Sequence, residues 1–445
     1  MSDLFVIGAS GTKAYRAAMA AISENIANAS TTGYARRSVV TAESGSSTAT
    51  MAVYISRTNF GGTEISGVSR ASDPYLDARV RSTGMALASA NARSRWLTDA
   101  ETALNDTSTG VGQLMTGMFQ NMEKLAASPN DKSLRVTTLD SIGRIAQAFN
   151  QTASDLKNVS SGIATEAQFS VRATNDALNS LADINGSLLR AQPGTSAYAQ
   201  LLDSRDAALQ TLSENLNVTI DFGAHDSAQV SFGGQTLVSG ATASNLALTT
   251  NANGSLSFAL TDGTALAAPT NGALGGYVSA ASTVVDRRAS LDALASKFVN
   301  AVNDWHAGGR TDAGAAGAPL LSYGTGAATV PALITDPAAL AVKGTDGVGN
   351  GNLLRAASVL RGNGSAEQDW TSLIATHGNA LAAVAAEKTT AQSRDDQAVA
   401  AREAVSGVDL DMEAADLLRI QQAYQGSAKV LQIARETVDT ILKIM

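Results

Sequence analysis

Histidine is the side chain that most often moves protons or binds metals near neutral pH, and this chain has three. His225, His306 and His377 lie far apart, and none has a second histidine three or four residues away that would complete a metal site on a helix face. The sequence contains neither a G-x-S-x-G nucleophile motif nor a phosphate-binding loop. Because His306 follows Trp305 at the end of a predicted helix, we expect it to be a capping or packed ring. The histidines therefore predict no catalytic residue.

Two groups of acidic and amide side chains are the remaining candidates for a chemical site. Asp203 and Asp206 are three residues apart in a predicted helix, with Arg205 beside them. This spacing is typical of an ion-pair face that is solvated or lies between helices. Asp346 and Asn350 lie in a glycine-rich run, but the run lacks the spacing and the distal glutamate of a calcium loop. We therefore expect no metal, no cofactor and no enzyme activity.

Length, charge and cysteine content limit the class of protein. The 445 residues suggest about two to four domains, and a net charge of −8 without a basic block argues against nucleic acid or an anionic membrane as a partner. There is no cysteine, which excludes disulfides and zinc–thiolate sites. Residues 1–30 predict no conventional signal peptide. Proline and glycine break the uncharged runs 263–285 and 314–335, so neither predicts a transmembrane helix.

The stretch 408–444 has the most regular apolar pattern in the chain. From Leu410 to Val438 an apolar residue recurs every seven positions, which predicts a helix with a coiled-coil seam. A second apolar row from Ile420 to Ile444 runs beside the first, so the apolar arc is wider than the single stripe of a surface helix. We expect this helix to touch more than one neighbour. The alternative is a core helix of a large helical domain.

Helical periods also occupy most of the rest of the chain. A helix of roughly 50 residues, which would be about 75 Å long, is predicted after the turn at residues 128–131. A final long helical pair is predicted for 365–444, with a break at Gly407. The other predicted helices cover residues 10–28, 74–105, 111–127, 198–216 and 283–306.

Strand-like alternation is confined to two places. Residues 217–262 predict hairpins with turn chemistry, and residues 50–70 predict a small hairpin around Gly61-Gly62. The predicted fold class is mainly α with a small inserted β-domain, in an elongated multi-domain protein with terminal coiled-coil helices. The expected domains are a terminal helical coiled-coil domain (1–40 plus 406–445), a long-helix domain with small β-hairpin elements (41–216 plus 275–405) and an inserted outer β-domain (217–274).

Motifs near both ends resemble proteins of the bacterial flagellum. Asn25-Ile-Ala-Asn-Ala29, followed by Thr32-Gly33-Tyr34-Ala-Arg36, resembles the N-terminal signature of flagellar rod, hook and hook-associated axial proteins. The stretch from Ser406 to Val430, which includes Leu417-Leu-Arg-Ile-Gln-Gln-Ala-Tyr424, is similar to the C-terminal motif of the family of flagellar hook-associated protein 1. The resemblance covers nearly the whole chain and is weakest in 223–270 and 325–400.

The resemblance implies a structural adaptor that joins hook and filament by axial self-assembly. Members of the family are exported unfolded through the flagellar type III apparatus without a cleaved signal peptide, so the implied location is the extracellular flagellum. They form a ring, and their terminal helices line the inner tube as coiled coils. The implied partners are further copies of the chain, the hook protein, the second junction protein (hook-associated protein 3), an export chaperone and the type III export apparatus.

We expect an assembly interface on the two terminal segments, with one seam of the last helix against the chain's own N-terminal helix and another against neighbouring subunits. The alternatives are a hook or distal-rod protein, a secreted coiled-coil adhesin and an exported surface hydrolase. The residues expected in the interface are Tyr15, Met19, Ile22, Asn25, Ile26, Asn28, Gly33, Tyr34, Leu410, Leu417, Ile420, Tyr424, Ala428, Leu431, Val438, Ile441 and Leu442.

Overall fold

The structure, a computed structural model, divides into two compact units. Unit 1 combines Met1–Met85, Ala173–Asn245 and Gln392–Met445, and unit 2 combines Ala86–Arg172 and Leu246–Ala391. Three of the four boundaries fall inside long helices, each of which therefore contributes residues to both units, and the fourth, at Asn245, falls between two strands. The residues described are 2–31, 33–44, 61–104 and 107–444, with side chains from residue 4 to residue 443.

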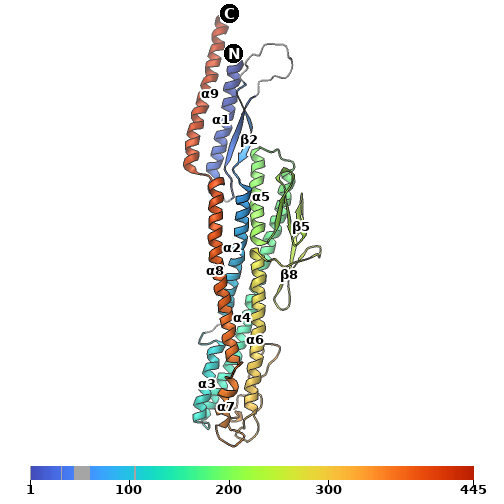
Figure 1. Ribbon diagram of the computed structural model, residues 1–445, viewed down its shortest axis with the longest axis vertical. Helices are drawn as coiled ribbons and strands as arrows, with labels where there is room; N and C mark the ends of the chain where they lie inside the picture. Colours follow the sequence, from blue (N-terminus) through green and yellow to red (C-terminus); the bar gives the residue numbers. More distant parts are fainter. Residues whose placement is uncertain (1, 32, 45–60, 105–106, 445) are drawn as a thin grey trace. The chain divides into compact units, whose positions relative to one another are not determined.

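An antiparallel helix pair forms the terminal part of unit 1. Helix α1 (Ser2–Asn28) packs along α9 (Leu410–Ile444), and the start of α1 lies beside the end of α9 (Figure 1). The other flank of α1 contacts an antiparallel hairpin made of β1 (Arg37–Glu43) and β2 (Thr63–Arg70). Helix α1 is therefore the element that joins the C-terminal helix to the hairpin.

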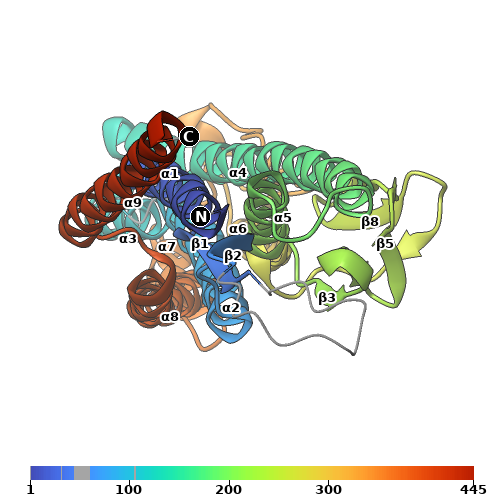
Figure 2. The same cartoon turned by 90° about the horizontal axis from the view of Figure 1, so that it is seen from above.

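The remaining helices of unit 1 are α5 (Ser196–Asn215), the start of α2 (Pro74–Leu104), the end of α4 (Lys132–Leu188) and the end of α8 (Ala366–Ser406). The side chain of Thr195 begins α5, because its hydroxyl oxygen accepts a hydrogen bond from the backbone N–H of Tyr198. Helices α2 and α8 run side by side in both cartoon views (Figures 1 and 2).

Unit 1 also contains a four-stranded antiparallel sheet in the order β3-β4-β5-β6. Asn185 of α4 (Lys132–Leu188) holds this sheet through its buried amide. The amide accepts a bond from Ala228 N at 2.8 Å, and donates to Ala228 O at 2.8 Å and to Gly240 O at 3.0 Å. The elements of this region are β3 (Thr219–Phe222), the short 3-10 helix η1 (Ala224–Asp226), β4 (Ala228–Phe232), β5 (Gln235–Ser239) and β6 (Thr242–Ala243).

Unit 2 packs parts of α2, α4 and α8 with three further helices and a three-stranded antiparallel sheet. Its core includes a tilted aromatic pair, Phe149 and Phe298, with ring centroids 5.7 Å apart. Gly162 of α4 leaves room for the Trp96 ring, because a Cβ there would lie 2.4 Å from Trp96 Cη2. The elements are α3 (Val111–Ala127), β7 (Leu246–Thr250), β8 (Leu256–Leu260), β9 (Ala265–Leu266), α6 (Gly272–Ala307), η2 (Pro337–Ala339) and α7 (Gly351–Leu360).

The predicted fold class, mainly α with small β elements, is confirmed. The long middle helix is α4, with 57 residues, and the break predicted at Gly407 separates α8 from α9. Helix α6 begins at Gly272, eleven residues before the predicted start at 283, and α7 lies outside the predicted helices. The described helices do not include one that is long and apolar enough to cross a membrane.

The structure describes only the second half of the hairpin predicted for residues 50–70. In that half, strand β2 pairs with β1, which precedes the predicted hairpin. Ser44 N donates to Gly62 O at 3.0 Å, which continues the pairing between the two segments by one more hydrogen bond. Residues 50–60, the other half of the predicted hairpin, lie outside the described residues.

The three expected domains remain a proposal. The contacts group the sheet of residues 219–243 with unit 1 and the sheet of residues 246–266 with unit 2, whereas the proposal treats 217–274 as one inserted domain.

Candidate assembly interface

Two glycines on one face of α1 allow α9 to pack closely. Gly8 and Gly11 are three residues apart and therefore lie on the same side of the helix. A Cβ at Gly8 would lie 2.7 Å from Leu431 Cγ, and a Cβ at Gly11 would lie 2.7 Å from Ser427 Oγ. The helix pair is therefore shaped by the absence of side chains on α1 as well as by the apolar side chains of α9.

Both apolar rows of α9 contribute to the contact inside the chain. Leu431 of the seven-residue row lies against Gly8, and Ala434 of the second row is the most deeply buried apolar residue of the helix. At 100° per residue the two rows occupy one continuous arc, not two opposite faces. The arc includes these predicted residues, which are half-buried in unit 1: Leu417, Ile420, Tyr424, Ala428, Leu431 and Val438.

The predicted interface residues of α1 include both buried and exposed side chains. Tyr15 and Met19 are half-buried and Ile22 is buried, whereas Ile26 is exposed. On α9 the predicted residues Leu410, Ile441 and Leu442 are exposed as well. These four side chains are between 37% and 66% exposed, and they remain candidates for contacts between subunits.

Three exposed apolar residues of α9 were missed from the sequence. Leu418 is 62% exposed, and Met412 and Ile433 are about half exposed at 55% and 49%. The seven-residue rule excluded them because they lie outside the two rows. Helical spacing alone places Leu418 and Ile433 on the side away from α1, which is the signal that would have identified an outward face.

The motif residue Asn25 is the centre of a buried hydrogen-bond network that joins the two ends of the chain. This network of Asn25, Tyr34, Arg36, Arg37 and Glu413 is here called the lock. The Asn25 side chain is 1% exposed and makes four hydrogen bonds. Its Oδ1 accepts from Arg37 N at 2.9 Å and from the Tyr34 hydroxyl at 2.8 Å. Its Nδ2 donates to Arg37 O at 2.9 Å and to Glu413 Oε2 at 3.1 Å. A carboxamide suits this position because it offers a donor and an acceptor to one backbone unit.

Glu413, in the first turn of α9, is the C-terminal half of the lock. Its side chain is fully buried, and its other carboxylate oxygen accepts a bond of 2.5 Å from Arg36 Nε. The backbone N–H of Arg36 donates to Ser406 O at 2.9 Å, at the end of α8. The N-terminal motif therefore holds the point where α8 ends and α9 begins.

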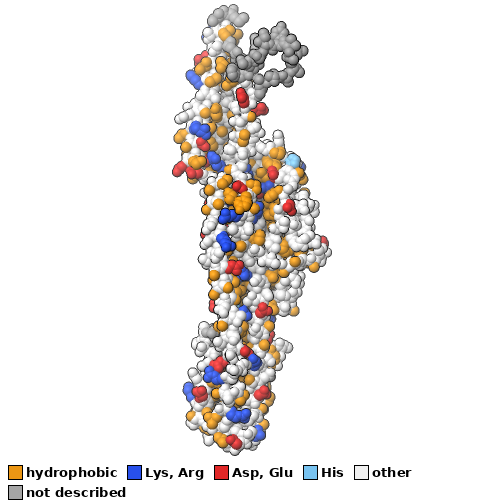
Figure 3. Space-filling model, in the orientation of Figure 1, with side chains coloured by type: hydrophobic (Ala, Val, Ile, Leu, Met, Phe, Trp, Pro, Cys, Tyr) orange, Lys and Arg blue, Asp and Glu red, His pale blue; other side chains and the backbone are white. Residues whose placement is uncertain are grey.

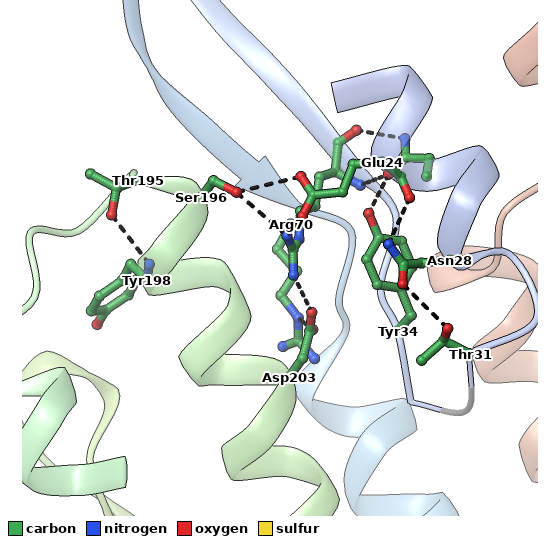
Figure 4. A network of polar contacts seen from close by, with 11 residues as sticks. Glu24, Asn28, Thr31, Tyr34, Arg70, Thr195, Ser196, Tyr198 and Asp203 are labelled. Carbon is green, nitrogen blue, oxygen red and sulfur yellow. Dashed lines mark hydrogen bonds and ion pairs between the residues drawn. The ribbon is translucent and has the colours of Figure 1, made fainter. Parts of the chain in front are cut away.

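An arginine–aspartate network continues from the lock to α5 (Figure 4). Arg37 pairs with Glu24 and with Asp203, whose Oδ2 lies 2.7 Å from Arg37 Nη2. Arg70 of β2 lies 2.6 Å from Asp203 Oδ1 and 2.7 Å from Asp206 Oδ2. Burial lowers the pKa of Arg70, but the two aspartates outweigh burial and raise this pKa above its ordinary value. The ion-pair face expected on α5 therefore exists, with arginines of the β1–β2 hairpin as its partners.

The loop between α1 and β1 places Tyr34 over this network. Gly33 has a φ of +79°, a value that favours glycine. The guanidinium carbon of Arg37 lies 5.0 Å from the centroid of the Tyr34 ring, within cation–π range. Burial raises the pKa of Tyr34 to about 12, so its hydroxyl stays protonated and donates to Asn25. Asn28 caps the end of α1, because its Nδ2 donates to Glu24 O at 2.9 Å.

Two of the side chains that had been considered for chemistry have structural contacts. The buried ring of His306 has Nδ1 2.6 Å from Ala318 O and accepts at Nε2 from Ala341 N at 2.8 Å, which confirms the expected packed ring. Asn350 donates to Ala126 O at 2.8 Å and so ties the glycine-rich loop to α3. Among the described residues, no group of three or more His, Cys, Asp or Glu side chains is arranged to hold a metal ion.

Comparison with known families gives three matches along the chain. Residues 97–321 match the flagellar hook-associated protein FlgK helical domain. Residues 403–444 match the flagellar basal body rod FlgEFG protein C-terminal region, and residues 5–34 match the flagella basal body rod protein family. The two end matches contain Asn25, Tyr34 and Glu413 of the lock, and the central match covers half of the chain.

Similar whole proteins agree with these matches. The chain is 22% identical to flagellar hook-associated protein 1 of Bacillus subtilis (strain 168), with 97% of this chain and 96% of the relative covered. It is 26% identical to flagellar hook-associated protein 1 of Escherichia coli (strain K12), with 73% and 60% covered.

The fold matches the structure of the flagellar hook junction protein FlgK from Burkholderia pseudomallei with a TM-score of 0.65 at 15% identity, over 74% of this chain and 100% of that one. Because the central family match covers half of the sequence, this chain belongs to the family of flagellar hook-associated protein FlgK.

Proposed function

We propose that this chain is a structural adaptor that forms the junction between hook and filament, and that it assembles axially through α1 and α9. The observation that carries the proposal is the lock at Asn25. In the lock, residues of the N-terminal motif hold the start of α9, so that α1 and α9 are joined as one helix pair. Part of the apolar surface of this helix pair stays exposed, at Leu418, Ile433 and Leu410.

The uncovered surface is large enough to contribute to assembly. Burying one Leu or Ile side chain stabilises a contact by about 1.5–3 kcal/mol. Association costs about 4–15 kcal/mol in lost freedom of motion. A few such residues from each of several subunits therefore offset the cost, whereas a single isolated contact between two chains does not.

The finer parts of this proposal follow from the family. We propose further copies of the chain, the hook protein and the second junction protein, hook-associated protein 3, as assembly partners. An export chaperone and the type III export apparatus would act before assembly, and the site of action would be the extracellular flagellum. The absence of cysteine supports passage as an unfolded thread, because no disulfide has to be broken or formed.

The proposal distinguishes this chain from a hook or distal-rod protein. The rod-protein families match this chain in its two end regions, 5–34 and 403–444. The central region 97–321 matches the helical domain of a hook-associated protein. A secreted adhesin would use its coiled coil as a surface that binds other molecules. The lock instead joins the two terminal segments to each other, which favours a structural role for them.

The test is the substitution Leu418→Asp in cells that make this chain as their only copy. A charge on the outward face of α9 is expected to abolish filaments while the purified variant keeps the wild-type circular dichroism and melting behaviour. The matched control is Leu354→Asp, because Leu354 is 65% exposed but lies on α7 in unit 2. Normal filaments on Leu418→Asp cells would contradict assembly through this face of α9.

A further inference from the structure

Asparagine is one of the thermolabile residues of proteins, and it loses its side-chain amide most readily where glycine follows it. The backbone nitrogen of the glycine attacks Cγ of the asparagine, ammonia leaves, and a succinimide ring forms. Solvent water then opens the ring to aspartate or isoaspartate. Glycine favours the attack because it has no Cβ and its backbone adopts many conformations. The chain has five such asparagines, namely Asn185, Asn253, Asn271, Asn350 and Asn363.

The fold holds two of these asparagines in packed surroundings. Asn185 is fully buried inside α4, where its amide makes three hydrogen bonds. Asn253 lies in the turn between β7 and β8, and its carbonyl oxygen accepts a bond of 2.9 Å from Arg288 Nη1. The next residue, Gly254, is buried, and its N–H donates to Asn251 O at 2.9 Å. At both sites the glycine nitrogen can reach Cγ only after packed structure opens.

Two further asparagines are fixed where helices begin. Asn271 caps α6, and its Oδ1 accepts a bond of 2.9 Å from Gly272 N, so the N–H of the attacking residue is already bonded. Asn350 precedes α7, and its Nδ2 donates to Ala126 O at 2.8 Å. The reaction at either site has to break a hydrogen bond that holds the start of a helix.

Asn363 lacks restraints of this kind. It lies in the exposed turn between α7 and α8, and its side chain makes no hydrogen bond with any residue that the structure describes. Gly364 is exposed with a φ of +73°, and its N–H donates at 2.8 Å to Oε1 of Gln368, an exposed side chain that water can replace. Figure 3 shows Lys, Arg, Asp and Glu side chains on the surface of unit 2 around α3 and α7, beside which this turn lies.

We propose that Asn363 is the site at which the folded chain first loses ammonia as it ages, and that the products are aspartate and isoaspartate. The reaction needs only solvent water besides the chain itself. It places a carboxylate on the cavity of about 110 Å³ that Lys297 and Glu367 also line. Isoaspartate also lengthens the backbone of the turn, where Gly364 O accepts a bond of 3.0 Å from Lys297 Nζ.

Ageing of the purified chain at neutral pH, followed by peptide mass spectrometry, tests the site. In the folded chain Asn363 is expected to react at least about tenfold faster than each of the other four asparagines, because a reaction that needs local opening is slowed by the free energy of opening. In urea the fold is lost, and all five are expected to react within about threefold of one another. A folded chain that protects Asn363 as strongly as the other four, or in which another of them reacts as fast, would overturn the proposal.

Release of ammonia provides a second readout with a matched pair of variants. Asn363→Gln is expected to lower the early release from the folded chain by more than about half, because the reactive turn no longer carries an asparagine. The matched control is Asn253→Gln, in the other exposed turn that contains one of the five asparagines, and it is expected to leave the release unchanged. Undiminished release from Asn363→Gln, or an equal fall in both variants, would overturn the assignment.

Discussion

Replacing Asn25 by alanine tests whether the lock holds the terminal helices in place. The substitution removes all four hydrogen bonds of the side chain and leaves the buried backbone N–H and C=O of Arg37 without partners. An orphaned buried polar group costs about 1–3 kcal/mol. Tyr34 is half-buried and Glu413 keeps its bond to Arg36, so the two backbone groups dominate the cost. We expect Asn25→Ala to destabilise the terminal pair by about 3 kcal/mol.

Hydrogen–deuterium exchange measured by peptide mass spectrometry reports this local change. Where exchange requires local opening, a loss of about 3 kcal/mol corresponds to roughly 100-fold faster exchange. The increase is expected in peptides of α1, β1 and the start of α9. Peptides of α3 and α6, which belong to unit 2, are expected to exchange as in the wild type.

The same motif provides a matched control. Asn28→Ala removes a half-buried amide whose donor bond to Glu24 O water can replace, so we expect a loss below about 1 kcal/mol and less than roughly fivefold faster exchange. Equal exchange in wild type and Asn25→Ala would refute the lock, and so would wild-type α1 and α9 peptides that exchange as fast as an unfolded chain.

Three further predictions concern helix packing, pH and the two sides of α9. Gly8→Val is expected to push α9 from α1, because even a Cβ at this position would lie 2.7 Å from Leu431 Cγ; exposure of α9 to limited proteolysis is the measurement, and wild-type resistance would contradict it. Burial lowers the pKa of His306 and of His377, so the unfolded chain binds protons near pH 6.5 that the folded chain does not bind, and stability is expected to fall as pH drops below that value. Urea unfolding of the purified chain at pH 7.5 and pH 5.0 measures this effect, and equal midpoints would contradict it. Leu431→Asp is expected to make α9 sensitive to proteolysis in the free chain, whereas Leu418→Asp leaves that sensitivity unchanged and stops only assembly.

The helices could be predicted from the sequence because their information is local. Apolar spacing predicts where α3 and α9 lie, Asp409 caps the start of α9, and Gly407 provides the break before it. The pairing of β2 could not be predicted in this way. Its partner β1 precedes a segment with stronger alternation, and a local rule selects the nearer stretch.

The candidate interface was predictable in part for the same reason. Periodicity identified the apolar rows of α9 but could not show that both rows share one arc against α1, nor that Leu418 and Ile433 form the outward side. The lock joins Asn25 to Glu413 across 388 residues, and in the sequence Glu413 is an ordinary acidic residue of a first helical turn. Its burial becomes understandable only when Arg36 and Asn25 lie beside it.

Electron microscopy of cells that lack this chain, combined with an assay of flagellin in the medium, tests the proposed junction most directly. The account predicts bare hooks without filaments and flagellin lost to the medium. Cells without hooks would move the protein to the rod or the hook, and cells with normal flagella would contradict a role at the junction.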